Sequence, residues 1–169
     1  VMHPLLRQAA TIADKKNLFF YFLLFIAALM RIWNYWGISF SHDELSLLVR
    51  IRNNSFFEIL SQSIHDHTAH SVFTPLFLSV WTSLFGISEA AVRFPFVLAG
   101  IGSVALVFMI AKKWFGHTTA CLSSLVIALL SLPIFFSRVA SPYGFSLCFS
   151  LLSAYCWTQL IFGDHKKIY

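Results

Sequence analysis

The sequence predicts an all-α integral membrane protein, and three observations carry this prediction. Hydrophobic residues make up 58% of the 169 positions and charged residues only 11%. The mean hydropathy is +0.74. The apolar residues also gather in long blocks separated by short polar segments. Soluble domains average about 45–50% apolar and about 25% charged residues, so this chain belongs in a bilayer.

Four apolar blocks are long enough to cross a membrane. A hydrocarbon core of roughly 30 Å requires about 20 apolar residues in helical conformation. The predicted transmembrane helices cover residues 17–36, 91–112, 118–137 and 143–163. No repeat, linker or low-complexity tract divides the chain, so residues 1–169 are predicted to form a single membrane unit. The first block lacks a cleavage site after it, and we expect it to remain as an anchor.

A fifth apolar run, residues 71–87, is shorter and contains Pro75, and two placements are open: it spans the membrane or lies flat in the outer interface. Cytoplasmic loops collect lysine and arginine. With four spans and a cytoplasmic N-terminus, every lysine falls inside and five of the seven acidic residues fall outside. This distribution favours the interfacial placement. The loop 37–90 and the turn 137–142 then share the outer face.

Short interfacial helices are predicted in the outer loop 37–90. Ser41 and Glu44 have the S-x-x-E spacing of a capping box, which predicts a helix that begins near Asp43 and ends near Ile51. A second short helix is predicted over residues 55–64, where apolar residues recur at helical spacing.

Asp43 and Glu44 are the acidic residues of greatest interest, because they lie where the first span should emerge into water. Glu44 has a structural role available as part of the capping box. Asp43 lies in the same first turn, where the helix dipole favours an ionised carboxylate. Such a carboxylate can accept a proton, bind a cation or simply be solvated at a helix start, and the spacing alone leaves these roles open for Asp43.

The turn 137–142 carries Arg138 to the same outer face, where it can meet Asp43. Guanidinium groups match phosphate oxygens and stay charged near lipid. The alternative for Arg138, and equally for Arg31 and Arg93, is an interfacial arginine that reaches the lipid headgroups. The turn makes Arg138 the best candidate of the three.

His65, His67 and His70, together with Asp66, raise the possibility of a divalent metal site. Their spacing matches no closed zinc site, and a hydrated surface loop explains them equally well. We therefore predict no metal ligands and no firm cofactor, with a divalent metal as the weaker alternative.

Several motifs, taken in order, resemble the N-terminal part of the GT-C membrane glycosyltransferases. The branch is that of the protein O-mannosyltransferases, the lipid A aminoarabinose transferases and the bacterial RgtA-like enzymes. The resemblance extends over residues 18–162 and rests on the order and spacing of RIWN at 31–34, DE at 43–44, TPLF at 74–77, LFGISE at 84–89, AVRFP at 91–95, LAG at 98–100, KWFG at 113–116 and FSRVASPY at 136–143.

The resemblance implies a GT-C type N-terminal module that transfers a hexose or pentose from a polyprenyl-phosphate donor. The acceptor would be a lipid, glycan or protein on the outer face of a bacterial inner membrane, and no nucleic-acid partner is expected. Asp43 would act as base or substrate-orienting carboxylate. Phosphate or sugar contacts would come from Arg138, Tyr143, His70 and Glu44.

Two points limit what the resemblance implies. The turn 137–142 contains no carboxylate, so a two-carboxylate metal site is not expected. Relatives continue for further helices, and we expect the chain to be part of a longer enzyme.

The alternative function is a transporter or lipid-handling subunit without enzymatic activity. The charges gather at the outer surface rather than at the helix centres, which favours the transferase.

Overall fold

The computed structural model describes residues 4–65 and 72–162, and the side chains of residues 18–62 and 72–162. Every regular element in this part of the chain is a helix, as predicted, and these residues contain no β-strand. The helices are α1 (Pro4–Ile32), α2 (His42–Asn53), α3 (Phe56–His65), α4 (Phe73–Phe85), α5 (Glu89–Phe115), α6 (His117–Leu129), α7 (Ser131–Arg138) and α8 (Pro142–Phe162).

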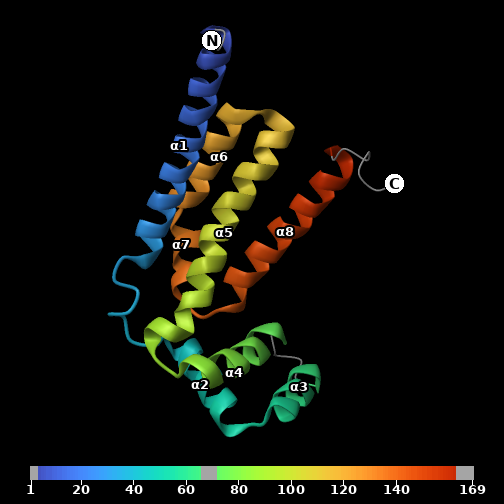
Figure 1. The fold of residues 1–169 in the computed structure, drawn as a ribbon. Helices are drawn as coiled ribbons and strands as arrows, with labels where there is room; N and C mark the ends of the chain where they lie inside the picture. The colour runs from blue at the N-terminus through green and yellow to red at the C-terminus, as the bar shows by residue number, and fades with distance from the viewer. Residues whose placement is uncertain (1–3, 66–71, 163–169) are drawn as a thin grey trace.

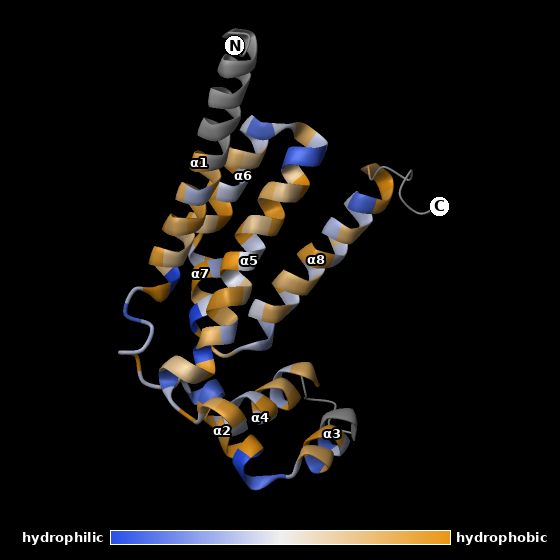
Figure 2. Cartoon of the chain, viewed as in Figure 1, coloured by the Kyte–Doolittle hydropathy of each residue, from blue (hydrophilic) through white to orange (hydrophobic). Residues whose placement is uncertain are grey.

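The helices form two groups. The longer group is a bundle in which α5 is central and contacts α1, α6, α7 and α8. The short helices α2, α3 and α4 gather at one end of this bundle, while α1 begins and α8 ends toward the other end (Figure 1). Hydrophobic residues line the bundle helices, and hydrophilic residues concentrate near the connections between them (Figure 2). This distribution is typical of a protein whose bundle contacts lipid.

By length and composition, α5 and α8 are each suited to cross a membrane. The pair α6 and α7 passes the same test when taken together, either as a broken span or as a re-entrant loop. The apolar stretches Leu18–Ile32 of α1 and Phe73–Phe85 of α4 are shorter. The described helices therefore support an integral membrane protein, and the arrangement with four spans stays a prediction.

The segment 118–137, expected as one helix, is interrupted. Helix α6 ends at Leu129, α7 begins at Ser131, and their axes differ by 56°. Pro133 explains why the break is tolerated, because it falls in the first turn of α7, where the missing amide proton is not needed. In a continuous helix, Pro133 would leave the carbonyl of Leu129 without its donor.

The short helices α2 and α4 are packed onto the bundle through a buried apolar cluster. Its buried members are Leu48, Leu78, Val92, Phe96, Ala140 and Phe145, which come from α2, α4, α5, α8 and the turn after α7. The ring of Phe77 on α4 meets that of Phe145 edge-on, with centroids 5.1 Å apart. This packing fixes these short helices against the end of the bundle, where the candidate residues lie.

Candidate functional site

The first turn of α2 is closed by the predicted capping box. The Ser41 hydroxyl accepts a hydrogen bond from the Glu44 amide at 3.3 Å, and the Glu44 carboxylate accepts one from the Ser41 amide at 2.9 Å. Both interactions satisfy amides that a helix start leaves free. The capping role predicted for Glu44 is therefore confirmed.

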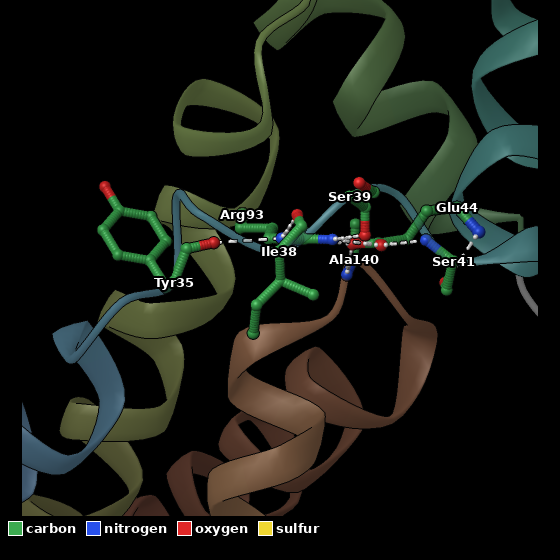
Figure 3. Close-up of polar contacts among 7 residues, drawn as sticks. All are labelled: Tyr35, Ile38, Ser39, Ser41, Glu44, Arg93 and Ala140. Atoms are coloured by element: carbon green, nitrogen blue, oxygen red, sulfur yellow. Dashed lines mark hydrogen bonds and ion pairs between the residues drawn. The ribbon is translucent and has the colours of Figure 1, made fainter.

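Glu44 makes further contacts that its helix does not require. Its side chain is completely buried, and it receives two hydrogen bonds from Arg93, at 2.8 Å from Nε and 2.6 Å from Nη2. The backbone amide of Ala140 donates a further bond of 2.8 Å to the same carboxylate (Figure 3). Fork-shaped pairing of this kind is among the strongest that side chains make. Glu44 thus joins α2 to α5 and to the turn after α7.

Arg93 uses every donor that its guanidinium possesses. Besides the two bonds to Glu44, it donates to the carbonyl oxygens of Tyr35, Ile38 and Ser39 at distances between 2.7 and 3.0 Å (Figure 3). A guanidinium has five N–H groups, and all five are satisfied here. Arg93 is only 1% exposed, so it is an internal cross-link between the segment 33–40 and α5 rather than an arginine that reaches lipid headgroups.

The pKa of Glu44 is set by two opposing causes. Burial alone would raise the pKa of this carboxyl, because charge is costly away from water. The hydrogen bonds from Arg93, from the Ala140 amide and from the Ser41 amide outweigh burial and hold the pKa of Glu44 below its ordinary value. Glu44 is therefore ionised at neutral pH and neutralised by Arg93.

Asp43, the adjacent acidic residue, lies in a different environment. Its side chain is exposed, and its carboxylate makes no hydrogen bond or ion pair with the part of the chain that the structure describes. Its backbone carbonyl accepts a bond from the Ser46 hydroxyl at 2.9 Å. The backbone of Asp43 is thus held within α2 while its carboxylate stays available.

Arg138 and Tyr143 flank the turn between α7 and α8. Arg138 donates from Nη2 to the Trp33 carbonyl oxygen at 2.8 Å, and its buried Nε has no partner among the described residues. No hydrogen bond or ion pair joins Arg138 to Asp43 in this arrangement. Tyr143 is exposed, and its ring lies 4.9 Å from that of Phe136.

The metal hypothesis falls largely outside the described residues. His70, His67 and Asp66 belong to the segment whose placement is not described, and so does the side chain of His65. Within residues 18–62 and 72–162, whose side chains the structure describes, no three His, Cys, Asp or Glu side chains converge as a metal site requires. The predicted contact of His70 with a donor phosphate likewise lies outside these residues.

The sequence did not reveal the partner of Glu44, which lies 49 residues away in α5. The available signal was an arginine close to the start of an otherwise apolar helix. Such a charge requires a partner when it is buried. Arg31, at the end of α1, gives the same signal and is also completely buried.

A cleft of about 500 Å³ lies between the far ends of α5 and α8. It is lined by Ile110, Trp114, Ser150, Ser153, Ala154, Trp157 and Thr158. Trp114 is in the last turn of α5, whereas Arg93 is in its second turn. The cleft is therefore separate from the residues around Glu44.

One family of known proteins matches this chain. The sequence model of the dolichyl-phosphate-mannose-protein mannosyltransferases matches residues 69–168. The matched region contains Arg93, Arg138 and Tyr143, whereas Asp43 and Glu44 precede it. No curated protein and no solved structure matches significantly. The family match confirms the resemblance to the GT-C glycosyltransferases.

Proposed function

Because the chain belongs to the dolichyl-phosphate-mannose-protein mannosyltransferase family, we propose that it takes a sugar from a polyprenyl-phosphate donor. The acceptor is a lipid, glycan or protein, and transfer takes place on the outer face of the membrane. The four-span arrangement, with a cytoplasmic N-terminus in a bacterial inner membrane, is part of this proposal. It puts α2, α3 and α4 on the side where transfer occurs.

The observation that carries the proposal is the contrast between two adjacent carboxylates. Glu44 is buried, and its oxygens are occupied by Arg93 and by backbone amides. Asp43 is exposed and has no partner among the described residues. Glu44 therefore holds the first turn of α2 in place, and Asp43 presents a carboxylate on a fixed backbone. A positioned carboxylate of this kind is what a general base requires.

The proposed reaction displaces a phosphate from the anomeric carbon of the sugar. The acceptor hydroxyl attacks that carbon while Asp43 takes the hydroxyl proton, or orients the hydroxyl for attack. The bond from the anomeric carbon to the phosphate oxygen breaks, and the polyprenyl phosphate leaves with the bonding electron pair. Fixed cations and donors then stabilise the charge that develops on the phosphate.

Arg138 and Tyr143 are the proposed donors to that phosphate or to the sugar. Arg138 commits one described hydrogen bond to Trp33, and its position is thereby set while Nη1 remains available. Tyr143 is exposed in the first turn of α8, on the other side of the same turn in the sequence. His70 stays a proposed contributor from outside the described residues. We assign Glu44 a supporting role because its oxygens are already occupied.

The transporter alternative gains no support from the buried charges. Arg31 and Arg93 are the buried cations of the described helices, and both are held by backbone carbonyls, with Glu44 as an additional acceptor for Arg93. Neither lines an aqueous path of the kind that transported ions require.

Substitution of Asp43 by Asn in the full-length protein tests the proposal. Transfer of labelled mannose from mannosyl polyprenyl phosphate to endogenous acceptors is measured in membranes. Loss of a positioned base should lower transfer by roughly 10²–10⁴-fold. Because Asp43 has no described partner, the thermal unfolding midpoint should stay unchanged.

Glu58→Gln is the matched control, since Glu58 is another exposed carboxylate in the first turn of a short outer helix. This variant should retain full transfer. Unchanged transfer by a well-expressed Asp43→Asn protein would remove Asp43 from the chemistry. No transfer by the unsubstituted protein from any polyprenyl-linked sugar would overturn the function itself.

A further inference from the structure

Arg31 is a buried cation that no carboxylate of the described residues neutralises. It lies in the last turn of α1 with no exposed surface, and it forms no ion pair within the described residues. Its Nη1 donates to the carbonyl oxygens of Ala27 at 3.1 Å and Ala128 at 3.3 Å, and its Nη2 donates to that of Ile127 at 3.4 Å. Its Nε is buried and has no hydrogen-bond partner in the described part of the chain. A buried charge destabilises the fold unless hydrogen bonds or an opposite charge compensate for its lost hydration.

The acceptors of Arg31 lie at the end of a helix. Ile127 and Ala128 belong to the last turn of α6, which ends at Leu129 just before the 56° bend. The last four carbonyl groups of a helix have no donor within it and carry its partial negative charge. In apolar surroundings an unpaired carbonyl is energetically costly. Arg31 therefore satisfies the carbonyls that the break releases, and the helix dipole stands in for a counter-ion.

A glycine provides the space for this contact. A Cβ atom on Gly100 of α5 would lie 2.9 Å from Arg31 Nε and 2.5 Å from Ser137 Cβ, both closer than real atoms approach. Gly100, Ser137 and Arg31 are each buried. Helices α1, α5 and α7 therefore meet at this point, next to the end of α6.

The bend determines where α7 leads. Helix α7 ends at Arg138, which donates to the Trp33 carbonyl oxygen directly after α1. Two residues later, the Ala140 amide donates to Glu44. The direction that α7 takes after the break therefore determines whether Arg138 can reach Trp33 and whether Ala140 can reach Glu44.

We propose that Arg31 is a positioning residue that caps the open end of α6, fixes the bend between α6 and α7, and thereby places Arg138 and Ala140 at the outer site. The effect of Arg31 on sugar transfer rests on the proposed function. The effect of Arg31 on the bend between α6 and α7 is independent of that function.

The bend is measured in the full-length protein by the distance between spin labels at Leu122 and Phe135. These positions are exposed on α6 and α7, and the native cysteines are replaced first. Arg31→Gln removes the charge and should broaden or shift the distance distribution. Arg31→Lys keeps a cation and should largely restore it. Arg52→Gln removes an exposed arginine of α2 and should leave the distribution unchanged.

Gly100→Ala is the second variant, and it keeps the measurement informative if Arg31→Gln fails to fold. The added Cβ crowds both Ser137 of α7 and the Arg31 side chain, and it leaves the charge of Arg31 in place. It should shift the same distance distribution, in the direction of Arg31→Gln.

Sugar-transfer rates, measured alongside the distances, distinguish failure of this inference from failure of the proposed function. Misplacement of Arg138 should lower transfer by roughly 10²-fold, with partial recovery in Arg31→Lys. An unchanged distance distribution in folded Arg31→Gln would overturn the inference whatever the transfer rate. A shifted distribution together with unimpaired transfer by Asp43→Asn would support the role of Arg31 in the bend and remove Asp43 from the chemistry.

Discussion

Helices α2 and α3 begin with the same motif and reach different tertiary environments. Ser41 and Glu44 close the first turn of α2, and Ser55 and Glu58 do the same for α3, with a 2.7 Å bond from the Ser55 amide to Glu58. Glu58 is exposed, and its described bonds end at Ser55. Glu44 is buried and continues to Arg93 and Ala140.

The difference shows how much of a carboxylate's role is decided outside its own helix. Both boxes satisfy the same free amides, so their local contribution is similar in kind. Only the box of α2 has a buried arginine facing it from another helix. The α2 box therefore acts as a tertiary junction, whereas the α3 box only starts a helix, and the two can be compared by matched substitutions.

The largest effect is expected from replacing each glutamate by glutamine. Glu44→Gln leaves the guanidinium of Arg93 buried without a counter-charge, which should lower the free energy of unfolding by about 3–5 kcal/mol. Glu58→Gln should change it little, because the side chain is solvated. Thermal unfolding of the purified proteins in detergent measures both. Equal destabilisation by the two substitutions would show that the pair with Arg93 adds nothing to the cap.

A smaller effect is expected from removing the two cap hydroxyls. Ser41→Ala should destabilise the protein by about 1 kcal/mol, the usual loss for an N-cap. It should also speed hydrogen exchange at the Ala140 amide, because the Glu44 carboxylate is less well held. Ser55→Ala should leave exchange at Ala140 as it is. Faster exchange at Ala140 in both variants would contradict the idea that only the α2 box is coupled to the turn.

The smallest effect is expected from mild acid. Hydrogen bonds hold the pKa of Glu44 below its ordinary value of 4.5, despite burial, and those from Ser55 lower the pKa of Glu58. The stabilisation by Glu44 is thus complete above about pH 4.5 and is lost as the pH falls through its lower folded value. Unfolding midpoints measured between pH 7 and pH 3 should decline at the acid end. Glu44→Gln should flatten this decline more than Glu58→Gln does, because Glu44 is buried and Glu58 is exposed. An equally steep decline in Glu44→Gln would assign the acid dependence to other groups.

The local parts of this architecture could be predicted from sequence. The S-x-x-E spacing predicts the start of α2, and apolar recurrence predicts α3, because both signals lie within one or two turns of the chain. The length of the apolar blocks likewise predicts α5 and α8. These elements depend on neighbours in sequence, and the structure contains all of them.

The non-local parts could not be predicted. Nothing near Glu44 indicates that Arg93 will face it, since 49 residues separate them. The break after Leu129 lies in an unbroken apolar run, and Pro133 alone does not distinguish a kink from a new helix start. Arg31 looked like an interfacial cation because its acceptors are backbone carbonyls, which every sequence provides.

The same property of backbone acceptors has a consequence for the segment between α1 and α2. Arg93 holds this segment by the carbonyl oxygens of Tyr35, Ile38 and Ser39. Every residue type has that carbonyl, so side chains at these positions can change without loss of an acceptor. Insertion or deletion of one residue would change which carbonyls face the guanidinium. This connection is therefore tolerant of substitution and intolerant of changes in length, whereas ordinary surface loops accept insertions readily.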